Sequence, residues 1–303
     1  MLTRGLFRTV LGAALSASGL FAAESPCSAT EYGLSEYFLG LTIPLSGYLP
    51  PPGVYFSDSF FLYQGTRSAN QITPTTTGNF VFNVAQTGYL FDLGFAGATL
   101  GFVATIPFVG VSAAIPALGI QGDIAGLGDT DYSAVIGWHA GDHNWLVAVT
   151  GFAPTGDYNP ARLVDDGLHR PAVDIKGGYT FLSLQTGFEA SGALGMIING
   201  WNSATQYQSG AELHFEWALN QHFPFGLAAG VGGYFYQQVT DDWGAGDLLG
   251  PYRGRVAAIG PLLSYALKVG EQEVDFTARW FHDFAVQNRP RGDAIWTTMS
   301  FRL

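Results

Sequence analysis

The sequence predicts an all-β fold: a transmembrane antiparallel up-and-down β-barrel of about twelve strands. Three observations predict it. Only 12% of the 303 residues are charged, roughly half the share in a soluble domain, so less of the surface faces water. Several segments alternate apolar and polar residues with a period of two, as strands do. The segments between them alternate short and long, like the periplasmic turns and outer loops of bacterial barrels.

The first 29 residues read as a signal peptide. Arg4 and Arg8 supply its positive region, and residues 10–21 form an apolar run of signal-peptide length. Small residues allow cleavage after Ala23 or after Ala29. Cys27 is the one cysteine of the chain, so no intrachain disulfide forms, and the preceding Ser-Pro does not resemble a lipoprotein cleavage box.

Residues 30–52 precede the first expected strand. They carry several apolar side chains and a turn-forming Pro-Pro-Pro-Gly sequence at residues 50–53. One interpretation is that this segment enters the barrel lumen as a plug, and the other is a disordered periplasmic tail. Residues 53–303 form the barrel in either case.

The clearest strand is residues 205–219. One face of it would carry Ala211, Leu213, Phe215, Trp217 and Leu219, and the other Glu212, His214 and Glu216. Residues 272–284 repeat this alternation, with Asp275 and Arg279 on the polar face. A charge on the lipid face costs a few kcal/mol near the bilayer midplane, so the polar faces should line the lumen.

The same pattern continues along the chain. It predicts strands at residues 53–64, 79–92, 96–107, 130–140, 144–154, 172–185, 188–199, 205–219, 226–240, 254–268, 272–284 and 293–303. The strands at 96–107 and 188–199 have the weakest alternation. An even strand count with short even-numbered connections places both termini in the periplasm.

An uncharged stretch between Asp92 and Asp123 is long enough for a transmembrane helix. Pro107 and Pro116 interrupt it, and glycines are scattered through it, which favours one strand followed by an apolar outer loop. The loop, residues 108–120, includes Ile115 and Leu118. Apolar residues are unusual in an outer loop, and exposed apolar patches usually mark binding sites.

We therefore expect this loop to form a hydrophobic entry pocket at the barrel mouth, helped by Trp201, Tyr207, Tyr234 and Tyr236, since ligand pockets are typically apolar with a few polar anchors. The alternative is a loop that packs on a neighbouring loop. The row Glu212, His214 and Glu216 has two interpretations as well, a cation-binding or selectivity patch or the ordinary polarity of a lumen wall.

Other function classes lack support. The net charge of −11 and the 13 basic residues argue against nucleic-acid binding. The sequence has no Gly-x-Ser-x-Gly elbow, zinc-protease motif or phosphate loop, so no catalytic residue, cofactor or metal is predicted. Residues 126–131 could be read as a calcium loop, but their spacing does not match one and a turn is favoured.

Short motifs occur in order along the chain. They are Thr30-Glu31-Tyr32-Gly33, Pro50-Pro51-Pro52-Gly53-Val54-Tyr55-Phe56, Gly126-Leu127-Gly128-Asp129, Gly137-Trp138, Pro154-Thr155-Gly156-Asp157-Tyr158, Tyr207-Gln208-Ser209-Gly210-Ala211-Glu212, Gly233-Tyr234-Phe235-Tyr236-Gln237-Gln238-Val239-Thr240-Asp241-Asp242, Gly260-Pro261 and Asn288-Arg289-Pro290-Arg291-Gly292. Together they resemble the outer-membrane, transporter-like proteins associated with the meta-cleavage pathway of phenol degradation. The resemblance implies an outer-membrane barrel that helps aromatic or other hydrophobic compounds enter the cell. The chain departs from many such barrels by ending in Leu303 and not in an aromatic residue.

The expected function is passive uptake of small hydrophobic or aromatic compounds across the outer membrane of a Gram-negative bacterium. The expected partners are outer-membrane lipid, these compounds and the barrel-assembly machinery, with no nucleic acid. One alternative is a structural or surface-interaction barrel with an occluded lumen. A weaker alternative is a membrane-embedded hydrolase, which would need a serine such as Ser183, Ser191 or Ser264 beside His214.

Overall fold

The computed structural model describes residues 33–68, 74–247, 253–270 and 272–303. The predicted signal peptide and its two cleavage sites lie outside these residues. Within them, no helix is long and apolar enough to cross a membrane.

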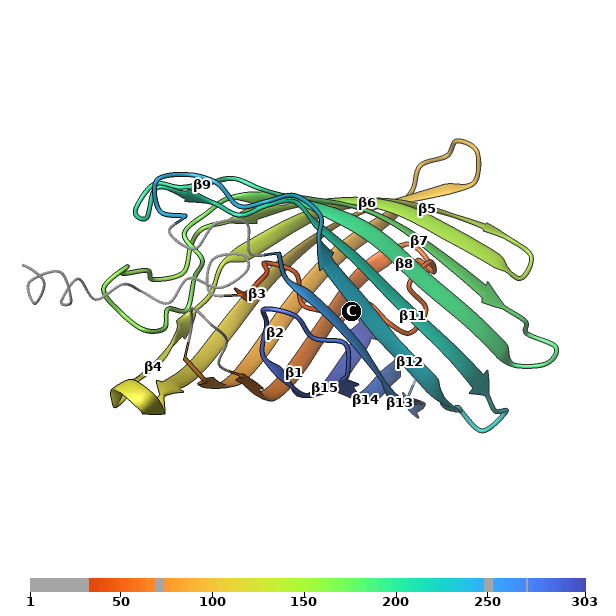
Figure 1. The fold of residues 1–303 in the computed structure, drawn as a ribbon. Helices are drawn as coiled ribbons and strands as arrows, with labels where there is room; N and C mark the ends of the chain where they lie inside the picture. Colours follow the sequence, from red (N-terminus) through yellow and green to blue (C-terminus); the bar gives the residue numbers. More distant parts are fainter. Residues whose placement is uncertain (1–32, 69–73, 248–252, 271) are drawn as a thin grey trace, which may run out of the picture.

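Twelve antiparallel strands form one closed barrel (Figure 1). β1 pairs with both β2 and the last strand, β15, and the β2–β3 pairing completes the ring. The prediction of a twelve-stranded barrel is thereby confirmed, including the two weakly alternating strands. The barrel strands are β1 (Gly53–Arg67), β2 (Thr76–Asp92), β3 (Ala98–Ile115), β5 (Thr130–Ala140), β6 (His143–Ala153), β7 (Ala172–Leu182), β8 (Phe188–Asn199), β11 (Glu212–His222), β12 (Leu227–Gln238), β13 (Arg255–Val269), β14 (Gln272–Asp283) and β15 (Arg291–Arg302).

The prediction that residues 108–120 form an apolar outer loop is wrong. β3 continues to Ile115, turns through the short helix η2 (Pro116–Leu118) and returns as β4 (Ile120–Leu127). This β3–β4 hairpin projects from the long-loop end of the barrel (Figure 1). Pro107 fits a strand because it lies where β3 changes partner from β5 to β4, and Pro116 starts the helical turn, a position that needs no N–H.

The predicted strand at residues 205–219 begins too early. Its first residues belong to a small outer hairpin of β9 (Trp201–Asn202) and β10 (Tyr207–Gln208), and β11 begins at Glu212. The alternation nevertheless assigned the faces correctly, since Glu212, His214 and Glu216 point inward and are buried.

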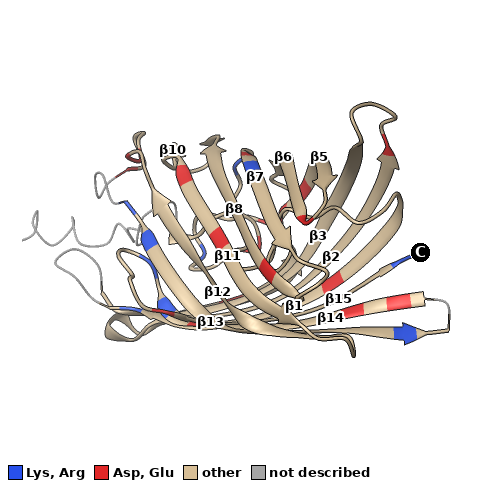
Figure 2. Ribbon diagram, turned by 90° about the vertical axis from the view of Figure 1, so that its right-hand side faces the viewer, with Lys and Arg blue, Asp and Glu red and all other residues tan. Residues whose placement is uncertain are grey.

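The outer face of the barrel is apolar. Phe60, Val81 and Phe102 are among its exposed side chains, and most residues of the strands are uncharged (Figure 2). A closed sheet satisfies its backbone hydrogen bonds internally, so this surface suits a lipid bilayer and places the chain in the outer membrane. Asp58 on β1 is an exception. It lies on the outward face, where it accepts a 2.8 Å hydrogen bond from the Asn83 amide.

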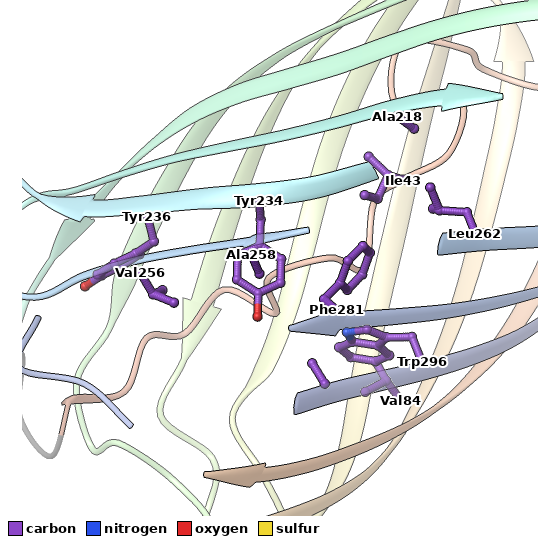
Figure 3. Close-up of a cluster of buried hydrophobic side chains, with 11 residues drawn as sticks. Ile43, Val84, Ala218, Tyr234, Tyr236, Val256, Ala258, Leu262, Phe281 and Trp296 are labelled. Carbon is purple, nitrogen blue, oxygen red and sulfur yellow. The ribbon is translucent and has the colours of Figure 1, made fainter. Parts of the chain in front are cut away.

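The N-terminal segment, residues 33–52, lies inside the barrel (Figure 1). Leu34 is at the long-loop end, where its carbonyl accepts a hydrogen bond from Arg170. Pro51 is at the opposite end, beside Tyr55 at the start of β1. In between, Ile43 joins the largest buried apolar cluster, which includes Trp296, Phe281 and Leu262 from the wall (Figure 3).

Candidate functional site

The lumen has a polar wall formed by β7, β8 and β11, and this wall binds the N-terminal segment. The Glu216 carboxylate accepts hydrogen bonds from the Gly40 N–H (2.6 Å) and the Thr42 hydroxyl (2.6 Å). Glu212 accepts one from the Ser35 hydroxyl at 2.5 Å. Both carboxylates are fully buried, so these donors take the place of water around them.

His214 lies between the two glutamates and contacts both the wall and the segment. Its Nε2 is 2.9 Å from Asp174 on β7. Its ring stacks on the ring of Tyr37 in the segment, with centroids 3.8 Å apart. The Lys176 ammonium nitrogen lies 5.1 Å from the centroid of the Tyr37 ring. Together, Glu212, His214 and Glu216 therefore fix the position of the N-terminal segment.

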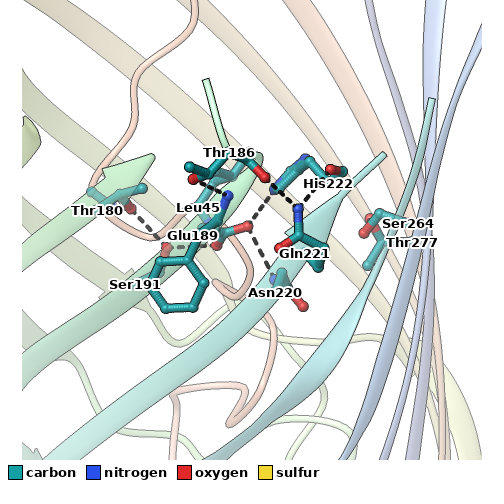
Figure 4. Close-up of polar contacts among 12 residues, drawn as sticks. Leu45, Thr180, Thr186, Glu189, Ser191, Asn220, Gln221, His222, Ser264 and Thr277 are labelled. Carbon is teal, nitrogen blue, oxygen red and sulfur yellow. Dashed lines mark hydrogen bonds and ion pairs between the residues drawn. The ribbon is translucent and has the colours of Figure 1, made fainter. Parts of the chain in front are cut away.

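A second polar cluster is centred on Glu189 of β8, near the short-turn end (Figure 4). Its carboxylate accepts hydrogen bonds from Ser191 (2.6 Å), Asn220 (3.0 Å) and the Leu45 N–H (2.9 Å), and it pairs with His222 at 2.7 Å. One of these four partners belongs to the N-terminal segment, so this cluster also binds the segment to the wall.

The segment also makes a close backbone contact with the wall. A Cβ added at Gly178 on β7 would lie 2.2 Å from the Ser46 carbonyl oxygen, and one at Gly47 would lie 2.4 Å from the backbone of Tyr179. Both positions require glycine because no side chain fits between the two backbones. The Gly47 N–H also donates to the Thr180 hydroxyl at 2.9 Å.

The opposite wall is apolar and encloses a cavity of about 160 Å³ at the long-loop end. Phe61 and Tyr63 of β1 face Phe82 and Phe80 of β2 in register, and Trp296 of β15 lies 4.3 Å from Phe61 between ring centroids. The N-terminal segment supplies Phe38, whose ring packs on those of Phe82 and Trp296. An apolar cavity of about 150 Å³ holds benzene, so this one suits a single aromatic ring.

Two polar groups are built into the apolar wall. Asp283 accepts hydrogen bonds from Tyr63 (2.9 Å), Tyr234 (2.8 Å) and the Gly292 N–H (3.1 Å). Arg289 lies over the ring of Tyr236, 4.1 Å from its centroid.

The loop between β6 and β7 covers the outer side of the cavity. Asp129, between β4 and β5, accepts hydrogen bonds from the N–H groups of Gly156 (2.8 Å) and Leu168 (2.6 Å) in this loop. Asp165, Asp166 and Leu168 of the loop line the cavity. Burial raises the pKa of both aspartates and of Asp129 above the usual range.

The structure distributes the predicted candidate residues over several places. Tyr234 lines the cavity, and Tyr236 is buried beside it. Arg279 is buried and donates to the carbonyls of Gly40 and Leu41, at 2.7 Å each. Four candidates lie outside the cavity. Asp275 is exposed on β14, and the Trp201 ring contacts that of Trp243 in a tilted arrangement, with centroids 5.3 Å apart. Ile115 is buried at the end of β3, and Leu118 is exposed at the hairpin tip.

Part of the apolar stretch does line the cavity. Val109 and Val111 on the inward face of β3 contribute to it, and Val111 and Ala113 contribute to a smaller cavity of about 80 Å³ under the hairpin. The aromatic residues of β1, β2 and β15 were missed by sequence reasoning. Their signal was the spacing of two at Phe61 and Tyr63 and at Phe80 and Phe82.

The serines considered for a hydrolase have other partners than His214. Ser191 bonds Thr180 and Glu189, Ser264 bonds Thr277, and Ser183 accepts the Thr186 N–H. In the described part of the chain, no three His, Cys, Asp or Glu side chains are placed to hold a metal ion.

Known structures share this fold. The COG4313 outer membrane channel from Pseudomonas putida F1 superposes with a TM-score of 0.75 at 16% identity, over 86% of this chain and 99% of the channel. The transport unit of the autotransporter AIDA-I from Escherichia coli gives a TM-score of 0.49 at 10% identity, over 86% and 92% of the two chains. The curated proteins include no match.

The family comparison agrees with the order of motifs along the chain. The model for the family described as "Putative MetA-pathway of phenol degradation" matches residues 63–299. This match includes most of the barrel and, apart from Phe61, the aromatic wall of the cavity. The chain belongs to this family of phenol-degradation-associated proteins.

Proposed function

We propose that this barrel is a passive channel for small hydrophobic compounds, above all those with one aromatic ring, and that the N-terminal segment is its plug. The observation that carries the proposal is the aromatic cavity of about 160 Å³ in the lumen. Its volume matches one ring, and the apolar wall makes transfer from water favourable. Ligand pockets commonly combine such walls with a few polar groups.

In this proposal a compound enters at the long-loop end and rests against Phe61, Phe82 and Trp296. Phe38 of the N-terminal segment forms part of the cavity lining. For the compound to move on toward the short-turn end, the N-terminal segment must shift. The compound that displaces Phe38 then makes the contacts that the Phe38 ring made with the wall. This coupling would admit hydrophobic solutes while limiting ions.

The experiment narrows the cavity without disturbing the lipid face. Ala294 is buried on β15 and lines the cavity, so Ala294→Phe should fill it and lower toluene uptake severalfold in cells that depend on this barrel. Ala278→Phe on the outward face of β14 is the matched control, and heat-modified electrophoretic mobility checks that both barrels fold. Unchanged uptake with a folded Ala294→Phe barrel would show that the cavity is not the route.

The second candidate, a surface-interaction barrel with an occluded lumen, is favoured by one observation: the N-terminal segment runs the length of the barrel. The same experiment separates the two functions. A surface-interaction barrel predicts no dependence of uptake on the barrel at all.

A further inference from the structure

Three carboxylate oxygens in the cavity wall have no hydrogen-bond partner in the protein. They are Glu36 Oε1, Asp165 Oδ2 and Asp166 Oδ1. Glu36 is 6% exposed and Asp166 8%, so water does not readily replace the missing donors. A buried acceptor left unsatisfied is costly, and three around one cavity indicate a ligand that donates hydrogen bonds.

The other carboxylates of the cavity are already satisfied. Asp129 accepts two backbone N–H groups, and Asp283 accepts three donors. Altogether five carboxyl groups and one guanidinium line the cavity. Arg162 already pairs with Asp165 at 2.9 Å, so the unmet demand is chiefly for hydrogen-bond donors beside Glu36 and Asp166.

We infer that the cavity selects small aromatic amines, with the ring against the aromatic wall and the ammonium group toward Glu36 and Asp166. This inference rests on the proposed function and names the preferred substrate class. An ammonium group offers three donors, which matches the unpartnered oxygens. Aromatic faces also attract a cation within about 6 Å, and Tyr37, Phe38 and Tyr63 line the same cavity.

Other ligand chemistries fit less well. An aromatic carboxylate could use Arg289, whose Nη1 has no partner, but it would face the three unpartnered carboxylate oxygens. A plain hydrocarbon would leave these acceptors unsatisfied. A metal ion needs several ligands around one point, and the described residues hold no such group.

Three ligands of similar size test the inference: benzylamine, benzoate and toluene. Binding is measured by calorimetry on the full barrel in lipid nanodiscs at neutral pH, with empty nanodiscs subtracting partition into lipid. We expect benzylamine to bind at least tenfold more tightly than toluene, and benzoate to bind most weakly. Glu36→Gln and Asp166→Asn should each reduce this preference severalfold and leave toluene binding unchanged.

Asp123→Asn is the matched control, because Asp123 is exposed on β4 and lies outside the cavity. It should leave all three affinities unchanged. Toluene or benzoate binding as tightly as benzylamine would overturn the amine preference but keep an aromatic-binding cavity. If none of the three binds, the proposed function fails along with the inference.

Discussion

At the scale of single residues, charge decides which faces could be predicted. Glu212, Glu216 and Arg279 could be assigned to the lumen because a charge in lipid is costly. Phe61 and Phe82 could not, since their strands are apolar on both faces and Phe60 and Leu62 alternate with them. The partners of the inward charges were also invisible, because they lie on a segment more than 170 positions away.

Removing one charged anchor should loosen the segment. Glu216→Gln keeps the shape of the side chain but weakens its hydrogen bonds with Gly40 and Thr42, each worth about 1.5–3 kcal/mol when the acceptor is charged. Ion conductance in planar bilayers should rise severalfold. Glu273→Gln at an exposed position on β14 is the control and should conduct like the unchanged protein; equal conductance of the two variants would contradict this role of Glu216.

The raised pKa values of Asp165 and Asp166 give benzylamine binding a pH dependence. The ammonium group interacts with the charged carboxylates, which are present above their pKa. Because burial raises the pKa of both aspartates, binding should weaken as the pH falls from neutral, before ordinary aspartates become protonated. Calorimetry over a pH series tests this, and Asp166→Asn should flatten the profile.

Asp58 is an exception to the charge rule and should reduce stability. It lies on the outward face of β1, bonded to Asn83 of β2, with apolar neighbours on either side along its strand. Replacing both residues, as Asp58→Val with Asn83→Val, should stabilise the barrel in lipid by about 1–2 kcal/mol. Urea unfolding in vesicles measures this, and a loss of stability would show that the pair serves the fold.

At the scale of elements, strand number and faces could be predicted, but the β3–β4 hairpin could not. Pro107 and Pro116 looked like breakers, although one sits at a change of strand partner and the other begins a helical turn. Val109 and Val111 of β3 could be assigned to the inward face only once the register of β3 against β2 was known.

The hairpin tip should be dispensable for assembly. Ser112 and Asp123 face each other across it, so replacing residues 113–122 with Asn-Gly should close a two-residue turn. We expect the barrel to fold, since the N-terminal segment hydrogen-bonds to other strands, but with a lower melting temperature, because the deletion removes the buried Ile115. Heat-modified electrophoretic mobility and thermal unfolding test this, and failure to assemble would contradict it.

At the scale of the whole molecule, the N-terminal segment occupies the lumen. Removing residues 33–46 from the exported chain should expose Asp174, Glu212 and Glu216 to water. Conductance in planar bilayers should rise at least tenfold, and the reversal potential should show cation selectivity because acidic residues dominate this wall. A lumen that conducts as before would mean that the segment does not limit passage.

The path of this segment also sets an order of events during assembly. Its residues are made and exported before any strand, yet their partners, such as Thr180, Glu216 and Arg279, lie 133 to 239 positions later in the chain. Such distant contacts form late in folding. The segment must therefore stay within reach until β15 pairs with β1, and the barrel closes around it.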